Sequence, residues 1–183
     1  MDQFRRKTKM VDDRLELVKP AREWESQWRS MCQERAETDE IGASGYTQTV
    51  PPEDFGELLR RYETQETRDE PGRVRQTTYW LVRSEKVIGE SRLRHSLTPE
   101  LEQHGGHIGY MIRPSERRKA YGTAILKLTL EKARGIGLER ALITCSPNNI
   151  GSVRVAERSG GVRDTDGIEP DSGQPTRRYW IDL

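Results

Sequence analysis

Residues 107–124, HIGYMIRPSERRKAYGTA, contain the change from strand to helix that decides the fold. The first six residues form an apolar run typical of a strand, and Arg113-Pro114 ends it. An apolar face with helical spacing then extends over 121–134. A second apolar run of strand length at 141–145 completes a strand–helix–strand unit. This unit predicts a layered fold of sheet and helices.

Further elements are expected on both sides of this unit. The spacing of apolar, proline and glycine residues predicts a strand over 14–19, a helix over 21–37, a helix from Asp54 to Tyr62, a mobile polar connection over 63–76, a hairpin of strands 77–82 and 87–93, a helix from Asn149 to Ser159, and a closing strand over 176–183.

The length of 183 residues fits one domain, 1–183, with 1–13 expected as a flexible segment. Hydrophobic residues make up 32% and charged residues 33%, yet the apolar residues gather in short runs, which argues against wholesale disorder. No run reaches the ~18–20 apolar residues of a membrane span, and no apolar region follows the basic N-terminus. We therefore expect a cytoplasmic protein with no membrane partner.

Charge and cysteine content narrow the function further. Thirty-one Lys and Arg against thirty Asp and Glu leave a net charge of +1, which disfavours nucleic acid as a partner unless a local basic face such as 113–119 binds RNA. Cys32 and Cys145 lie far apart with no CxxC spacing. They are expected to be reduced, buried thiols, and no metal site is expected.

A cluster of cations lies where the strand ends and the helix begins. Arg117, Arg118 and Lys119 precede Tyr121. The first turn of a helix has N–H groups without intrahelical partners and a partial positive charge, so backbone amides in 118–123 can cradle phosphates. The alternative is that Gly122 only eases packing and the cations form a solvated surface.

The same stretch resembles the strand and acetyl-CoA loop of the GNAT N-acetyltransferase superfamily, whose loop pattern is Arg/Gln-x-x-Gly-x-Gly/Ala. Arg117 and Gly122 match the first and last positions, while the middle glycine is Ala120. Residues 149–160, NIGSVRVAERSG, look like the family's later Asn-x-x-Ser-x-x-x-x-Glu-Lys-x-Gly helix. The resemblance is strong over 106–161 and weak before Thr77.

The resemblance implies an α+β fold of the GNAT type, with a mixed, mostly antiparallel central sheet, flanking helices, and fourth and fifth strands that splay apart to admit acetyl-CoA. Pantetheine would lie along the cofactor strand, with its pyrophosphate on the loop amides. The implied cofactor-binding residues are Met111, Ile112, Arg117, Arg118, Lys119, Ala120, Tyr121, Gly122, Thr123, Asn149 and Ser152. Asn149 is equally suited to cap its helix.

Direct acetyl transfer to an amine needs a base, a donor to the developing oxyanion, and an acid for the departing thiolate. Glu90 stands where the family often carries a carboxylate base, with a surface glutamate as the alternative. His107 and His95 are further candidate bases, although a histidine in such a place is more often a hydrogen-bonded structural residue.

The acid that many relatives carry in the later helix is missing, because the matching residue is Ala156. Ser152 and Tyr110 are the candidates for that role, against alternatives in helix hydrogen bonding and packing. Cys145 lacks an accompanying His or Asp motif and is not expected to act as a nucleophile.

We therefore predict an acetyl-CoA-dependent N-acetyltransferase that acts directly on a primary amine of a small molecule or peptide. The alternative is a non-catalytic acyl-CoA sensor, favoured by Ala120 and Ala156. The cluster Glu34, Glu37, Asp39 and Glu40 can attract a cationic amine or be solvated helix-end charge. The closing strand can join a second copy in a homodimer or finish its own sheet.

Overall fold

The computed structural model describes residues 14–38, 54–170 and 172–183. Four strands form the first sheet in the order β1-β2-β3-β4, and every neighbouring pair is antiparallel. Their bounds are β1 Leu15–Val18, β2 Gln76–Arg83, β3 Lys86–Arg94 and β4 Ile108–Ile112. Because side chains alternate between the two faces of each strand, this sheet has a layer to bury on both sides.

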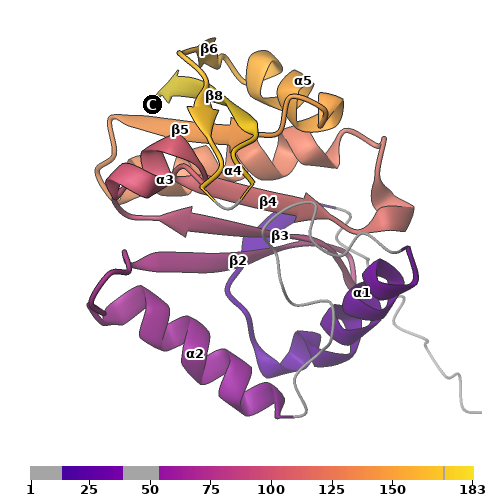
Figure 1. Cartoon of the computed structure of the whole chain (residues 1–183). Helices are drawn as coiled ribbons and strands as arrows, with labels where there is room; N and C mark the ends of the chain where they lie inside the picture. Colours follow the sequence, from indigo (N-terminus) through magenta and orange to yellow (C-terminus); the bar gives the residue numbers. More distant parts are fainter. Residues whose placement is uncertain (1–13, 39–53, 171) are drawn as a thin grey trace, which may run out of the picture.

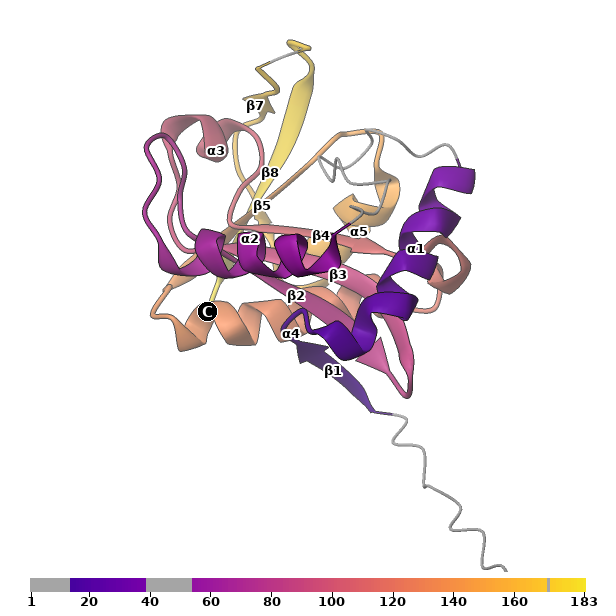
Figure 2. The same cartoon turned by 90° about the horizontal axis from the view of Figure 1, so that it is seen from below.

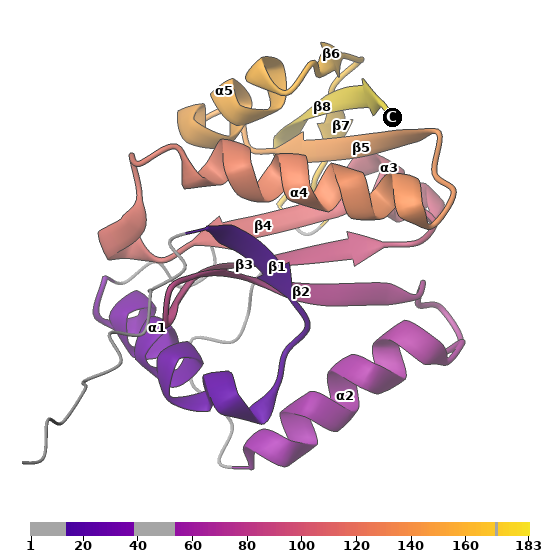
Figure 3. The ribbon, with the colours of Figure 1, turned by 180° about the vertical axis from the view of Figure 1, so that it is seen from behind.

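Helices cover both faces of the first sheet (Figure 1). The helix bounds are α1 Glu25–Glu37, α2 Phe55–Thr67, α3 Pro99–Gln103, α4 Tyr121–Gly135 and α5 Ile150–Arg158, with 3-10 turns at Arg22–Trp24 and Pro114–Glu116. Both α1 and α2 lie on one face, and α4 runs along the other, as the view from behind shows (Figure 3). No helix within the described ranges is long and apolar enough to cross a bilayer.

A second sheet has the order β5-β8-β6, and β7 also pairs with β8. The bounds are β5 Arg140–Cys145, β6 Val162–Arg163, β7 Gly167–Ile168 and β8 Pro175–Asp182. Tyr179 and Trp180 in β8 are paired with β5 on one side and β6 on the other. Of the two roles expected for the closing strand, the structure therefore shows the one within its own sheet.

The two sheets separate between β4 and β5. They are joined where the chain enters β4: the His107 N–H donates to the Leu142 carbonyl at 2.7 Å, and the Gly105 N–H donates to Thr144 Oγ1 at 2.8 Å. Beyond His107 no ladder connects β4 with β5 in the described part of the chain. Seen from below, the two strands diverge (Figure 2). This is the splayed arrangement predicted from the sequence.

The core has two parts, one on each face of the first sheet. The first lies under α4 and α5 and includes Ile125, Leu126 and Ile143. The second lies under α1 and α2 and includes Trp28 and Trp80. The apolar face predicted over 121–134 is buried in the first part, through residues such as Tyr121, Ile125 and Ala133 of α4.

Several expectations need correction. The polar connection predicted over 63–76 is helical up to Thr67, where α2 ends. The residues of α2 after Tyr62 are polar, so the apolar spacing gave no sign that the helix continues through them. The short helix α3 was not expected, although Thr98 caps it and Pro99 occupies its first turn. The sequence also gave no sign of β6 and β7, which are only two residues long and form by pairing with β8.

Candidate active site

The segment between β4 and α4 has an unusual backbone. Arg118 and Ala120 both adopt left-handed conformations, with φ of 62° and 65°. Ala120 is the residue before α4 and makes no side-chain cap. A left-handed alanine is disfavoured by about 1–2 kcal/mol, so the surrounding structure imposes this shape. Ala120 thus keeps the conformation that glycine adopts easily at the middle position of the GNAT pattern.

This backbone leaves consecutive N–H groups without protein acceptors. Within the described ranges, no oxygen accepts from the amides of residues 118–122. The amide of Thr123 differs, because it donates to the Ala120 carbonyl at 3.1 Å. Its predicted contact with phosphate through this N–H is therefore wrong. The available amides lie at the positive end of a 15-residue helix, which suits a diphosphate.

The side chains around the loop divide into two groups. Arg118 and Lys119 are exposed, whereas Tyr121 is buried and its hydroxyl accepts a hydrogen bond from Arg83. Tyr121 can thus contribute only its backbone N–H to the loop. A Cβ added to Gly122 would lie 3.2 Å from Val155, so the glycine allows α4 to approach α5. The packing role considered for Gly122 is therefore real.

The edge of β4 that faces the gap is defined by its pairing with β3. The backbone N–H of Arg94 donates to the His107 carbonyl, and the backbone N–H of Arg113 donates to the Ile88 carbonyl. Because hydrogen-bonded positions alternate in an antiparallel pair, the backbone groups of residues 107, 109, 111 and 113 point toward β3. Those of Tyr110 and Ile112 point toward the gap. The backbone contact expected from Met111 is therefore wrong, and these two neighbours are the available ones.

Arg117 closes this part of the site. Its Nε donates to the Ile112 carbonyl at 3.1 Å, which ties the start of the loop to the end of β4. The carbonyl of Ile112 is therefore engaged, while its N–H remains directed toward the gap. The side chain of Met111 is buried against the α1 and α2 layer.

Tyr110 and Ser152 bring β4 and α5 together. The Tyr110 hydroxyl is buried and makes no hydrogen bond of normal geometry. Burial raises the pKa of Tyr110 to about 12, and the nearby Ser152 hydroxyl offsets part of that rise. An unpaired buried hydroxyl is uncommon, because leaving it without a partner costs about 1–3 kcal/mol. Two residues predicted separately as candidate acids thus lie side by side.

Asn149 caps α5 as expected. Its Oδ1 accepts from the Ser152 N–H at 3.0 Å, so the side chain fixes the first turn that carries Ser152. Asn149 is exposed, so its amide nitrogen has room for another partner. Its expected contact with the pantetheine arm stays a prediction.

Glu90 lies on the opposite face of the sheet, enclosed by hydrogen-bond donors. It is 4% exposed. Its Oε2 accepts from Trp80 Nε1 at 3.2 Å and Trp28 Nε1 at 3.4 Å, with the Tyr62 hydroxyl at 3.5 Å. Its Oε1 accepts from Arg92 Nε at 3.0 Å. The surface role considered for Glu90 is wrong, and its lone pairs are engaged with protein donors.

His107 joins the two sheets. Its Nδ1 accepts from the Leu142 N–H at 3.0 Å, which places the ring proton on Nε2. Burial and the nearby cations Arg94 and Arg140 lower the pKa of His107 to about 4. The imidazole is therefore neutral at pH 7 and already uses the lone pair of Nδ1. This geometry favours the structural role over the catalytic one.

His95 also has a local partner, because its Nε2 lies 2.9 Å from Thr77 Oγ1. Burial lowers the pKa of His95. Cys32 and Cys145 are free and buried, as expected, and burial raises their pKa values to about 12 and about 11. Neither thiol is activated for nucleophilic attack.

The acidic cluster at the end of α1 is not a uniform surface. Glu34 bonds to Arg113 and Ser115, so it is not available to attract a cationic amine. Glu37 is exposed and accepts from Gln33. Asp39 and Glu40 lie outside the described residues.

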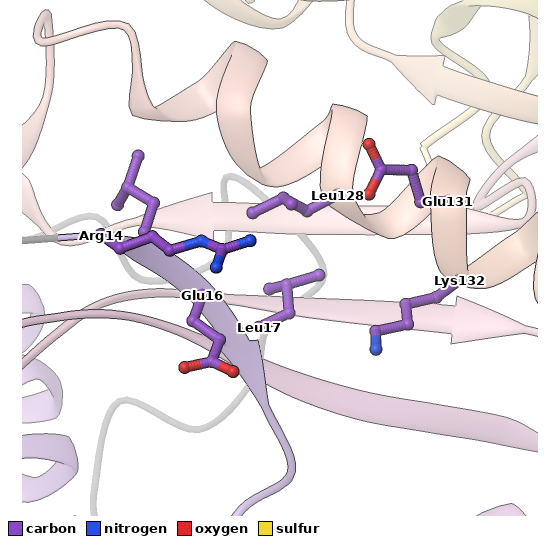
Figure 4. A pocket seen from close by; sticks show the side chains of 7 residues that line it. Arg14, Glu16, Leu17, Leu128, Glu131 and Lys132 are labelled. Carbon is purple, nitrogen blue, oxygen red and sulfur yellow. The ribbon is translucent and has the colours of Figure 1, made fainter.

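Two hollows in the described part of the chain lie away from the loop. One of about 180 Å³ lies between β1 and the C-terminal half of α4 (Figure 4). Its lining residues are Arg14, Leu15, Glu16, Leu17, Leu128, Glu131 and Lys132. The other lies beside α2 between Glu57 and Arg73. Within the described ranges, no group of three His, Cys, Asp or Glu side chains is arranged to hold a metal.

Sequence reasoning did not find the donors around Glu90 or the partners of Arg113. Trp28 and Glu90 are 62 residues apart, and Glu34 and Arg113 are 79 apart. Such contacts depend on how helices dock on the sheet, so local spacing gives no signal for them. A buried tryptophan in a polar chain is a hint, since its indole N–H needs an acceptor.

The family model described as Acetyltransferase (GNAT) domain matches residues 14–162. No curated protein matches the chain by sequence. Similar solved structures include the microcin self-immunity acetyltransferase MccE in complex with acetyl-CoA and AMP, at a TM-score of 0.70 and 14% identity over 94% of both chains.

Two further structures have the same fold. An acetyltransferase from Salmonella typhimurium, which modifies the N-terminal serine of a 50S ribosomal subunit protein, has a TM-score of 0.70 and 14% identity over 94% of this chain and 97% of its own. RimJ from Mycobacterium smegmatis, in complex with a CoA disulfide, has a TM-score of 0.69 and 13% identity over 92% of this chain and 82% of its own. With the splayed strands and the amide-lined loop, the match over most of the chain shows that it belongs to the GNAT acetyltransferase family and is an acyltransferase.

Proposed function

We propose that this protein is an acetyl-CoA-dependent N-acetyltransferase that transfers the acetyl group directly to a primary amine of a small molecule or peptide. The observation that carries the proposal is the row of amides at 118–122, which have no acceptor among the described residues and span the start of α4 beside the gap between the sheets. Backbone N–H groups at a helix N-terminus bind phosphates whatever the side chains are.

The residues present fit the cofactor. The amides of 118–122 would hold the pyrophosphate, and the exposed side chains of Arg118 and Lys119 would reach nucleotide phosphates. The gap-facing backbone of Tyr110 would pair with a pantetheine amide as an added strand does. Asn149 and Ser152 border the same gap from α5.

Acetyl-CoA would supply the acetyl group as a thioester. The N–H of Ile112, which points into the gap, is placed to donate to the oxygen that gains negative charge. Tyr110 would protonate the departing sulfur, with Ser152 beside it. The raised pKa of Tyr110 keeps its hydroxyl protonated at neutral pH, as an acid requires. Its hydroxyl also has no competing partner in the described structure.

Proton removal from the amine is assigned differently from the sequence prediction. Glu90 and His107 have their lone pairs engaged, so we propose that the acceptor binds as the neutral amine and its proton passes to water. The rate would then rise with pH until the amine itself is unprotonated. The chemistry depends mainly on holding the two reactants together.

Calorimetric titration with acetyl-CoA, followed by CoA release with a panel of amines, tests the proposal. The panel contains small primary amines and peptides with a free N-terminal serine or alanine. The peptides are included because one enzyme of similar structure modifies an N-terminal serine. Replacing Arg118 and Lys119 by Ala should weaken acetyl-CoA binding about tenfold. Lys127→Ala, an exposed cation farther along α4, is the matched control and should bind as wild type does. The absence of any binding heat would contradict the proposal.

A non-catalytic acyl-CoA sensor is the second candidate. The engaged lone pairs of Glu90 and His107, with Ala156 at the position of the usual acid, favour it. The two functions differ in turnover. Tight acetyl-CoA binding with no CoA release for any amine between pH 7 and 9 would support the sensor, whereas release that depends on both the amine and Tyr110 would exclude it.

A further inference from the structure

The end of β4 is fastened to α1 through one carboxylate. Glu34 Oε2 accepts from Arg113 Nε, and Glu34 Oε1 accepts from the Ser115 N–H, both at 2.5 Å. The Ser115 hydroxyl adds a third contact at 3.2 Å. Glu34 therefore binds the chain on both sides of Pro114 and fixes the direction in which it leaves the strand.

Arg113 depends on this contact. It is 8% exposed, and its Nη2 donates to Ser30 of α1 at 2.7 Å. Its Nη1 has no partner among the described residues. Glu34 thus supplies the carboxylate that is bonded to this buried guanidinium. Burial raises the pKa of Glu34, but the hydrogen bonds from Arg113 and Ser115 outweigh it and lower the pKa overall.

The loop that carries the 118–122 amides begins directly after this fastened segment. Arg117 is tied back to Ile112, and Glu116 bonds to Lys86 of the sheet and to Lys119 within the loop. Residues 117–122 therefore extend from a base that Glu34 holds on one side and Lys86 holds on the other. The left-handed backbone at Arg118 and Ala120 is unfavourable by itself, so it needs such a base to persist.

We propose that Glu34 is a positioning residue for acetyl-CoA binding: by fastening Arg113 and Ser115 to α1, it holds the 118–122 amides in the arrangement that receives the diphosphate. Glu34 touches no reacting atom in this role. The inference rests on the proposed function of the loop and adds to it a residue from the opposite side of the sheet, outside every motif of the family resemblance.

The test is Glu34→Gln, which keeps the size of the side chain and removes its charge. Its dissociation constant for acetyl-CoA, measured by calorimetry, should rise about tenfold, equivalent to about 1.4 kcal/mol. The kcat at saturating acetyl-CoA should stay within twofold of wild type, because the reacting groups are untouched. Glu34→Asp, which keeps the charge, should restore part of the affinity.

Glu37→Gln is the matched control, since Glu37 lies on the same helix, is exposed and accepts a hydrogen bond from Gln33. It should bind acetyl-CoA as wild type does. The melting temperature of each variant separates the two roles of Glu34: a purely structural contact lowers the melting temperature but leaves the dissociation constant of the folded protein unchanged.

Equal dissociation constants for Glu34→Gln, Glu37→Gln and wild type would overturn the inference while leaving the proposed function intact. If wild type itself binds no acetyl-CoA, the proposed function fails and this inference fails with it. If Glu34→Gln does not fold, Ser30→Ala carries the test, because it removes only the Arg113 Nη2 contact. That variant should weaken binding about threefold, and unchanged binding would contradict the proposal.

Discussion

Trp80 donates its indole N–H to Glu90 Oε2 at 3.2 Å, across the β2–β3 pair on the face covered by α1 and α2. Trp28 from α1 and Tyr62 from α2 donate to the same oxygen. One carboxylate thus connects both helices to the sheet. A base must have a free lone pair directed at its proton, and this network uses those of Glu90 instead to hold α1 and α2 on the sheet.

Glu90→Gln should therefore act on stability more than on chemistry. The amide NH2 would face indole and hydroxyl donors, and Arg92 would lose its ion pair, so we expect the free energy of unfolding to fall by about 2–4 kcal/mol. The kcat of the folded enzyme should stay within fivefold of wild type. Urea unfolding and steady-state CoA release measure the two quantities. A hundredfold loss of kcat with unchanged stability would instead restore Glu90 as the base.

Tyr110→Phe should give the opposite pattern. Removing a buried hydroxyl without a partner should leave stability unchanged or raise it by up to about 1 kcal/mol. Removing the proposed acid should lower kcat about 10–100-fold, with the acetyl-CoA dissociation constant unchanged. Ser152→Ala is the companion variant and should lower kcat less. Full kcat in Tyr110→Phe would exclude the hydroxyl as the acid.

The parts of this fold that could be read from sequence are those with local causes. The β4–α4–β5 unit follows from a change in apolar period, and the caps at Asp54 and Asn149 act within three residues of themselves. The row of amides at 118–122 could be predicted because it depends on the start of one helix. Only the three-dimensional structure showed that Thr123 bonds back to Ala120 instead.

The catalytic assignments were harder because a role depends on neighbours that are distant in sequence. The sequence around Glu90 does not distinguish a buried glutamate from one on the surface, because two of its donors come from the distant helices α1 and α2. Likewise, the pairing phase between β3 and β4 decides whether Met111 or its neighbours face the gap, and a shift of one residue would exchange them. Tyr110 and Ser152 meet only because α5 packs beside α4 and the gap.

The left-handed backbone at Ala120 predicts separate effects of a smaller and a larger side chain. Ala120→Gly relieves the strain but makes the unfolded chain more flexible, so we expect a net gain of about 0.5–1 kcal/mol with acetyl-CoA binding retained. Ala120→Val places a β-branched residue at φ 65° and should weaken acetyl-CoA binding at least fivefold.

Ser84→Gly is the control for this pair, because Ser84 has φ 55° in the β2–β3 turn, away from the loop. It should leave acetyl-CoA binding unchanged. If Ala120→Val binds acetyl-CoA as tightly as wild type, the loop does not depend on its left-handed geometry.

The buried imidazole of His107 predicts a loss of stability in mild acid. Its pKa is about 4 in the folded protein and 6.5 as the ordinary value, so between these pH values the unfolded chain binds the proton more readily. The stabilising contribution is complete above pH 6.5 and is lost as pH falls toward 4, by roughly 2 kcal/mol. His95, whose pKa is also lowered, adds to the same trend.

The comparison of wild type with His107→Asn isolates the contribution of His107, because the asparagine carbonyl can accept the Leu142 N–H without titrating in this range. Urea unfolding at intervals from pH 4.5 to 7.5 should give a shallower slope for the variant. Parallel curves for wild type and His107→Asn would show that the imidazole bridging the two sheets is protonated as easily as one in water.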